Sequence, residues 1–314
     1  MNNIQIYIHV GYPKNASTML QMDIFPNIPD MIYCGRSYGL ATTFSSQELE
    51  SAIHSISYKD SISYDANNVR ARIMSALNEM VSMSNRKVLI SWEAFMHNVA
   101  DRGLIATRLK DLFPNAKILF VIRNQLDSIE SMYHFLVAQG GGNINPTYGR
   151  PSVRSLTEWI ADQDDFSYRS YLGTLKYDEI YSHYVKLFSA KNVKVLLFED
   201  LKDSPQIFLN EIASFFGSSH IPIGLMQKRN SRPSSVMSKA FKFRNMLHDI
   251  GFQFAVPKLI STPVKRVLSL MDGLFKFDKL TDEQRNILSA RYKESNSKLQ
   301  SFIQKDLKSK NYPV

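Results

Sequence analysis

Cysteine is almost absent from this sequence, because Cys34 is the only one among 314 residues. A single cysteine cannot form an intrachain disulfide, so no disulfide framework holds the fold and a reducing compartment is indicated. Long apolar runs are also missing, since no stretch approaches the roughly 18 residues that a membrane span needs. Residues 1–10 lack the basic region and the long apolar run of a secretory signal. These absences predict a cytoplasmic protein.

Positive charge is concentrated late in the chain. The formal net charge is +9, and residues 235–314 hold 15 Lys/Arg against 7 Asp/Glu, an excess of eight. Such a balance favours anionic partners: a nucleotide, an acidic glycan or an anionic membrane. No nucleic-acid reader motif accompanies the charge, so nucleic acid is not expected as a partner. Residues 241–277 mix apolar and basic side chains, and either pack on the core or touch the inner face of the membrane as a peripheral surface.

Four short apolar runs predict buried strands at residues 4–10, 87–91, 117–122 and 193–198. Helical patterns separate them, and strands that alternate with helices predict an α/β fold with a parallel sheet covered on both faces. The expected helices are residues 17–24, 67–83, 103–112, 126–139, 177–188, 205–217 and 280–307. We expect one domain over residues 1–314, in which residues 235–314 form a basic helical region.

The loop after the first strand has the composition of an anion-binding site. Residues 11–20 (GYPKNASTML) follow a strand and open a helix, where free backbone N–H groups and the helix dipole favour negative charge. The candidate binding residues are Pro13, Lys14, Asn15, Ala16, Ser17 and Thr18. The loop is not a Walker A motif, because no second glycine precedes Lys14. A plain strand-to-helix turn with an exposed lysine remains the alternative for this loop alone.

A second phosphate-binding pattern follows the third predicted strand. Arg123 stands at the strand end, and Ser131 follows it two helical turns later, with Asp127 between them. An arginine there can donate two N–H bonds to phosphate oxygens, and the serine can add a hydroxyl donor.

Together the two motifs resemble those of the PAPS-dependent sulfotransferases of the bacterial or glycan type, where PAPS is 3'-phosphoadenylyl sulfate. The first matches P-K-[ST]-[GA]-[ST]-T and the second matches R-[ND]-P-x-[DE]-x-x-x-S, with departures at Asn15 and at Gln125, which replaces the usual proline. The resemblance implies a P-loop-like sulfotransferase fold. It also implies that the first loop holds the 5'-phosphosulfate, with Lys14 at the leaving oxygen, and that the second motif holds the 3'-phosphate.

Two further segments agree with this resemblance. Residues 197–201 (LFEDL) resemble an E-D-L segment of the family near the sheet end, and residues 228–232 resemble a late basic segment that closes over the 3'-phosphate. Lys228 and Arg229 are therefore expected to bind the nucleotide. A solvated basic loop is the alternative for these two residues.

The resemblance further implies transfer of a sulfonate group from PAPS to a hydroxyl or amine, without a metal. A general base is needed near the sheet end. Glu93 is the first choice because several glycan enzymes of the family use a carboxylate, and His97 is the second because its small-molecule enzymes use histidine. His9 and His134 are expected to be structural. The acceptor is expected to be a glycan or lipid-linked sugar, and a P-loop-like kinase or a non-catalytic nucleotide-binding protein stays as the alternative.

Overall fold

The computed structural model describes most of the chain outside one long late stretch. The described residues are 4–35, 46–80, 87–97, 101–139, 155–163, 170–222 and 278–314, with Gly224, Ser238, Phe241 and Lys242 between the last two ranges. Lys228, Arg229 and most of the segment 241–277 therefore lie outside the described residues.

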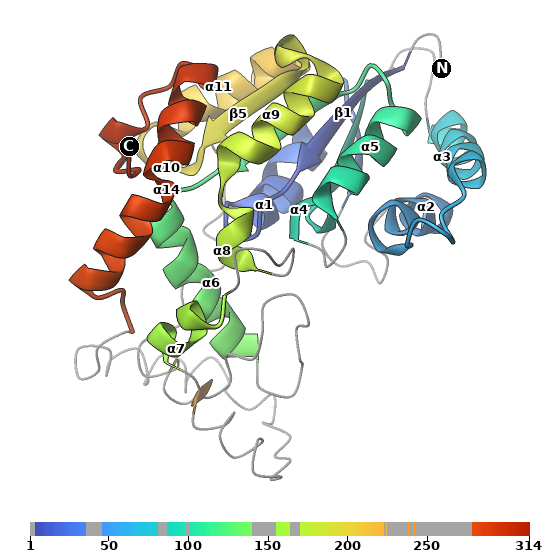
Figure 1. Ribbon diagram of the computed structural model, residues 1–314. Coiled ribbons are helices and arrows are strands. Elements are labelled where there is room, and N and C mark those ends of the chain that lie inside the picture. Colours follow the sequence, from blue (N-terminus) through green and yellow to red (C-terminus); the bar gives the residue numbers. More distant parts are fainter. Residues whose placement is uncertain are drawn as a thin grey trace, which may run out of the picture.

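Five strands form one parallel sheet in the order β2-β3-β1-β4-β5. The strands are β1 (Gln5–Val10), β2 (Ile32–Gly35), β3 (Lys87–Trp92), β4 (Lys117–Ile122) and β5 (Val193–Leu197). This sheet, with helices packed on both faces (Figure 1), confirms the expected α/β class. The strand β1 lies at the centre, so the segments that follow β3, β1 and β4 emerge side by side at one edge.

Alternate residues of each strand enter different cores. In β1 the side chains of Ile8 and Val10 join one apolar cluster, whereas Tyr7 joins the other. This alternation follows from the two-residue period of a strand, and burial on both faces explains why the strands are almost continuously apolar. Helices from most of the chain cover the first face: α2 (Gln47–Tyr58), α3 (Ala66–Met80), α5 (Arg102–Leu112), α6 (Gln125–Gln139), α9 (Tyr177–Phe188) and α14 (Asp282–Ile303).

Fewer elements cover the second face. They are α1 (Ser17–Met19), the π-helix η1 (Leu20–Ile24), the 3-10 turn η2 (Phe25–Asn27), α10 (Phe198–Asp203) and α11 (Pro205–Phe216). The short elements α4 (Ala94–His97), α7 (Leu156–Ala161), α8 (Tyr171–Thr174), η3 (Ala190–Asn192) and η6 (Lys308–Lys310) complete the described chain. The expected helix over residues 17–24 thus divides into a short α-helix and a π-helix.

Most predicted elements have the expected type, and several bounds differ. Strand β4 and helix α9 begin and end as predicted, whereas β2 and α2 were not predicted. The prediction that one helix runs to residue 307 was wrong, because α14 ends at Ile303 and Gln304 adopts the left-handed conformation that stops it. Residues 278–314 nevertheless pack into the same core as the sheet, through Leu288, Tyr292 and Leu299.

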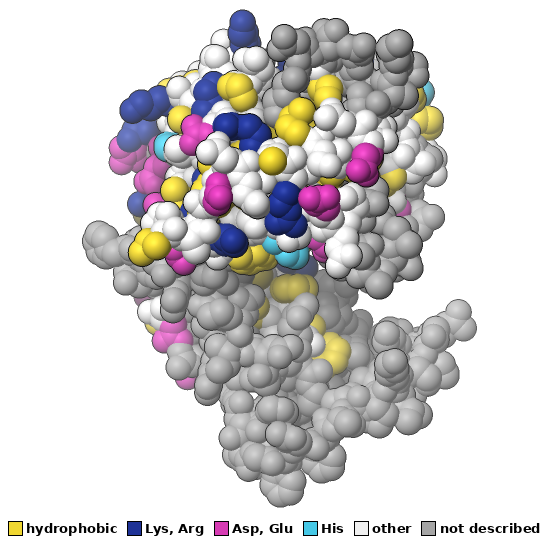
Figure 2. All heavy atoms as spheres, turned by 90° about the vertical axis from the view of Figure 1, so that its right-hand side faces the viewer, with side chains coloured by type: hydrophobic (Ala, Val, Ile, Leu, Met, Phe, Trp, Pro, Cys, Tyr) yellow, Lys and Arg dark blue, Asp and Glu magenta, His cyan; other side chains and the backbone are white. Residues whose placement is uncertain are grey.

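The described surface mixes charges of both signs. On the face in Figure 2, Lys/Arg and Asp/Glu side chains are interspersed instead of forming one basic region. No helix within the described ranges is long and apolar enough to cross a membrane.

One buried arginine fastens α2 to α5. Arg108 donates to the carbonyl oxygens of Ile56 (2.9 Å), Lys59 (2.7 Å) and Asp60 (3.0 Å), so it satisfies the acceptors left at the end of α2. The guanidinium also lies 3.9 Å from the centre of the Tyr64 ring. A methionine there would fill the space without replacing any of these donors.

We therefore expect Arg108→Met to lower the free energy of unfolding by about 3 kcal/mol, because it leaves the buried carbonyl of Ile56 and the part-buried carbonyls of Lys59 and Asp60 without this donor. Denaturant titration measures this change. Arg70→Met is the matched control, since Arg70 is exposed and donates one hydrogen bond, to the carbonyl of Asp111. A loss for Arg108→Met no larger than that of the control would contradict the assigned role.

Candidate functional site

The candidate residues meet where three neighbouring strands end. The loop with Lys14 follows β1, Glu93 follows β3, and Arg123 follows β4. Because β1 lies between β3 and β4 in a parallel sheet, these residues emerge at the same edge. In open α/β sheets ligands bind outside the carboxyl ends of the strands. The order of the strands therefore brings together residues that are more than 100 positions apart in the sequence.

The loop after β1 has an unusual backbone. Lys14 and Ala16 both adopt positive φ, at 67° and 68°, although neither is glycine. Left-handed residues at a strand-to-helix turn point successive N–H groups toward the same side, which forms an anion-binding concavity. The family pattern admits glycine where Ala16 stands, and this conformation explains why glycine suits the position.

Two polar side chains hold the loop in this shape. Ser17 Oγ donates to the carbonyl of Tyr12 at 3.0 Å, and Asn15 Nδ2 donates to the carbonyl of Val121 at 3.0 Å. Asn15 is fully buried, and its Oδ1 accepts from Ser128 Oγ at 3.4 Å. Its side chain therefore ties the loop to β4, and any ligand contact by Asn15 would come from its backbone N–H. Pro13 is buried, whereas Thr18 is half-buried on the opening helix.

Glu93 lies against this loop, and Gly11 makes the approach possible. A Cβ atom on Gly11 would lie 3.2 Å from Glu93 Cγ, 2.9 Å from Ser17 Oγ and 3.2 Å from His9 Cε1. Because those three atoms surround one point, Glu93 Cγ and Ser17 Oγ are at most about 6.1 Å apart, the sum of their distances from it. A side chain on Gly11 would push the carboxylate away from the loop. The Glu93 side chain therefore lies beside the loop that is the candidate sulfonate-binding turn.

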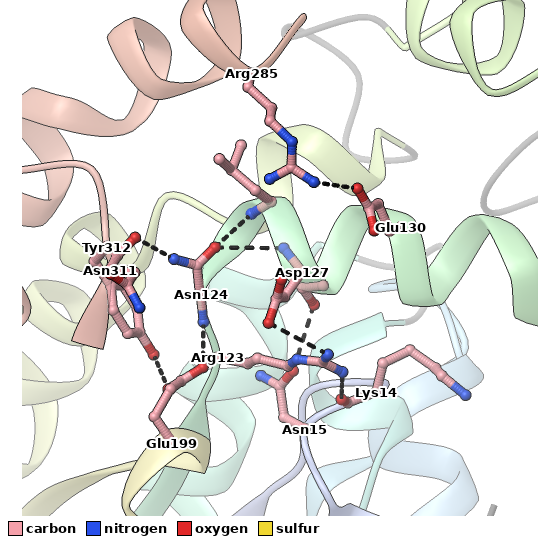
Figure 3. Close-up of polar contacts among 12 residues, drawn as sticks. Lys14, Asn15, Arg123, Asn124, Asp127, Glu130, Glu199, Arg285, Asn311 and Tyr312 are labelled. Atoms are coloured by element: carbon pink, nitrogen blue, oxygen red, sulfur yellow. Dashed lines mark hydrogen bonds and ion pairs between the residues drawn. The ribbon is translucent and has the colours of Figure 1, made fainter. Parts of the chain in front are cut away.

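Arg123 joins the two motifs directly. Its Nη1 donates to the carbonyl of Lys14 at 3.2 Å, and its Nη2 lies 3.7 Å from Asp127 Oδ2 (Figure 3). The guanidinium also lies 4.8 Å from the centre of the Phe198 ring. Arg123 Nε is buried and has no hydrogen-bond partner within the described part of the chain. A buried donor without a partner is costly, so this N–H fits an anionic ligand.

The Lys14 side chain takes a different direction. In Figure 3 it extends away from the guanidinium of Arg123. Its Nζ lies 4.3 Å from the centre of the Phe135 ring on α6, a cation–π contact. Ser131 precedes Phe135 by four residues and therefore shares its face of α6. The structure thus brings the Lys14 ammonium to the helix face that carries Ser131.

A buried polar cluster supports the start of α6. Asn124 Oδ1 accepts from the N–H groups of Leu126 (2.9 Å) and Asp127 (3.3 Å), so Asn124 caps the helix. Its own N–H donates to Glu199 Oε1 at 3.0 Å. Burial raises the pKa of the Glu199 carboxyl, while the hydrogen bonds from Asn124 and Tyr312 and the charge of Arg123 oppose that rise. Glu199 therefore contacts the residue that directly follows Arg123.

The histidines have distinct surroundings. His9 Nδ1 lies 2.8 Å from Ser91 Oγ, and burial lowers the pKa of His9 to about 3, so its ring is neutral at pH 7. His134 is buried, and its Nε2 lies 2.9 Å from the carbonyl of Asp278. His97 ends α4, but its side chain lies outside the described residues, as do Lys228 and Arg229. Within the described ranges, no three His, Cys, Asp or Glu side chains gather closely enough to hold a metal ion.

Sequence reasoning did not single out Gly11, Phe135 or Asn124 as site residues. The sequence did contain a signal for Gly11, because a glycine directly after a buried strand often marks a place where another group approaches the backbone closely. Asn124 carried one too, since asparagine before an apolar helical run is a capping residue. The contacts of Phe135 and Glu199 involve residues far apart in the sequence, and no local pattern reveals them.

One family model matches part of this chain. Residues 104–246 match the family model described as a sulfotransferase domain, a range that includes Arg123 and Ser131 but not the loop after β1. No curated protein matches the sequence significantly.

Solved structures resemble the fold. A sulfotransferase from Alicyclobacillus acidocaldarius is 16% identical with a TM-score of 0.57, and the likeness covers 98% of each chain. Mouse sulfotransferase SULT7A1, solved in complex with PAP (adenosine 3',5'-bisphosphate), is 15% identical with a TM-score of 0.45. The likeness covers 96% of this chain and 88% of the mouse chain. Residues 104–246 are thus similar to a sulfotransferase domain, and the chain shares its fold with the Alicyclobacillus sulfotransferase.

Proposed function

We propose that the protein transfers a sulfonate group from PAPS to a hydroxyl or amine of an acceptor. The observation that carries this proposal is the hydrogen bond of 3.2 Å from Arg123 Nη1 to the carbonyl of Lys14. It unites two candidate anion-binding elements at one sheet edge. A donor with a phosphosulfate at one end and a separate 3'-phosphate at the other needs two such elements. ATP, which lacks the 3'-phosphate, needs only the first.

The proposed reaction is an in-line displacement at sulfur. The acceptor oxygen or nitrogen forms a bond to sulfur while the bond from sulfur to the 5'-phosphate oxygen breaks, and adenosine 3',5'-bisphosphate (PAP) leaves. Negative charge grows on that oxygen, where the Lys14 ammonium and the loop N–H groups stabilise it. Lys14 must leave the Phe135 ring to do so. The acceptor's proton goes to the Glu93 carboxylate, whose side chain lies close to the loop because Gly11 has no side chain in the way.

The acceptor class is a finer proposal. A glycan or lipid-linked sugar agrees with a carboxylate base and with the net charge of +9, which favours anionic acceptors.

We also propose a cytoplasmic location, with peripheral membrane contact through the basic segment 241–277, and a single domain over residues 1–314. Lys228 and Arg229 are proposed to add contacts to the 3'-phosphate.

Calorimetric binding of PAP, AMP and ATP tests the donor site. We expect the wild type to bind PAP far more tightly than AMP, and Arg123→Ala to weaken PAP binding by about 100-fold, because the 3'-phosphate loses a forked charged donor. AMP binding should weaken much less than PAP binding, because the loop that holds the 5'-phosphate loses only its bond from Arg123 to the Lys14 carbonyl and keeps the bonds of Asn15 and Ser17. Arg70→Ala is the control, because Arg70 is an exposed arginine of α3 that donates to the carbonyl of Asp111. A preference for ATP would favour the kinase-like alternative, and no binding of any of the three would exclude a nucleotide donor.

Kinetics with radiolabelled PAPS test the base, once a screen of sugars and phenols has found an acceptor. We expect Glu93→Gln to lower kcat by about 100-fold or more while PAP binding stays within about twofold, because the amide keeps the shape of the side chain but cannot take a proton. His97→Ala is measured in parallel. A large loss in His97→Ala with an active Glu93→Gln would assign the base to His97 instead.

A further inference from the structure

The residues after α14 fold back onto the elements beside Arg123. Gln304 ends the helix in a left-handed turn, after which Leu307 and Tyr312 are buried in the core. Two lysines of this segment form ion pairs with α10 and α11. Lys305 Nζ lies 3.3 Å from Asp200 Oδ2 and 2.8 Å from Glu211 Oε1, and Lys310 Nζ lies 3.0 Å from Asp200 Oδ1 and 2.8 Å from Asp203 Oδ2. The segment is therefore fixed in place by its own contacts.

Residues 311–313, which we call the strut, touch the junction between β4 and α6. The carbonyl of Asn311 accepts a hydrogen bond from Asn124 Nδ2, and the Tyr312 hydroxyl donates to Glu199 Oε2 at 2.9 Å. The other oxygen of Glu199 accepts from the backbone N–H of Asn124 at 3.0 Å (Figure 3). The strut thus holds Asn124 from two sides, through its side chain and through its backbone.

The third strut residue acts through α14. The carbonyl of Pro313 accepts from Asn296 Nδ2 at 2.8 Å, and Asn296 pairs with Gln125 through amide hydrogen bonds of 2.7 and 3.2 Å. Both amides are fully buried, so each needs its partner. Gln125 stands where the family motif has proline, a residue that could not make this pair. The departure from the motif is therefore matched by a contact elsewhere in this chain.

These contacts fix the residues next to Arg123. Asn124 and Gln125 follow it directly, and its own carbonyl accepts from the Tyr177 hydroxyl at 2.8 Å. A guanidinium that must fork onto a phosphate has to be held within roughly 0.5 Å of the productive position. The backbone of Arg123 is thus held from α9 on one side and, through Asn124, from the strut on the other.

We propose that residues 311–313 are positioning residues for Arg123, so that recognition of the donor's 3'-phosphate depends on a segment almost 190 positions away in the sequence. This inference rests on the proposed function, because it assigns the 3'-phosphate to Arg123. The strut does not touch the ligand. It acts through Asn124, Glu199 and Gln125, which fix the backbone position from which the Arg123 side chain extends.

The test compares PAP and AMP binding by calorimetry in the full chain and its Tyr312→Phe variant. The substitution removes one hydroxyl and keeps the buried ring. We expect the dissociation constant for PAP to rise about fivefold, the usual effect of one lost hydrogen bond, while that for AMP stays within about twofold. Asn296→Leu, which breaks the link through Gln125, should shift the same ratio in the same direction.

Tyr7→Phe is the matched control. Tyr7 and Tyr312 are each 3% exposed, and each donates one hydrogen bond of 2.9 Å, Tyr7 to the carbonyl of Phe216. A general loss of stability would affect both variants alike and would weaken PAP and AMP together, so thermal midpoints are recorded for all proteins.

The outcomes separate the two proposals. A wild-type protein that binds PAP no better than AMP overturns the proposed function and this inference with it. A wild type that discriminates, with an unchanged ratio in both Tyr312→Phe and Asn296→Leu, overturns this inference alone. A lowered ratio in these variants but not in Tyr7→Phe supports the positioning role.

Discussion

The guanidinium of Arg123 donates to the carbonyl of Lys14, and the arrangement of the whole candidate site depends on this contact. It is possible only because β1 and β4 are neighbours in the sheet, which brings together segments 109 residues apart. Asn15 adds a second tie from the same loop to the carbonyl of Val121 in β4. The loop therefore cannot move without disturbing the arginine, and the two halves of the site behave as one unit.

The fold was largely predictable because buried parallel strands leave strong local signals. The run KILFVI predicted β4 with its observed bounds, since a strand buried on both faces is continuously apolar. The edge strand β2 was missed because it has only four residues, two of them half-buried. Helix α2 was missed although Ser46 caps it through the N–H of Leu49. Strand β2 is stabilised by pairing with β3, and helix α2 by packing on α3 and α5. These neighbours lie outside the segments that they stabilise, so a local pattern does not reveal them.

The candidate site was predictable by residue type and less so by contact. Lys14, Arg123 and Glu93 were identified from their places after strands, whereas the support from Glu199 and residues 311–313 depends on chain folding over long separations. The late positive charge shows the same limit. Lys305 and Lys310 were counted toward a basic surface, yet both form ion pairs with acidic residues of α10 and α11. Net charge alone does not distinguish a ligand-binding lysine from a lysine that joins two elements.

The left-handed backbone of Lys14 and Ala16 has a consequence for the thermodynamics of binding. Such residues cost about 1 kcal/mol or more each, and the fold meets this cost through the bonds of Asn15, Ser17 and Arg123 to the loop and its surroundings. The concave turn therefore exists before any anion arrives. An incoming phosphosulfate would lose its own freedom of motion without also having to freeze a flexible loop, so more of the contact energy remains available as affinity.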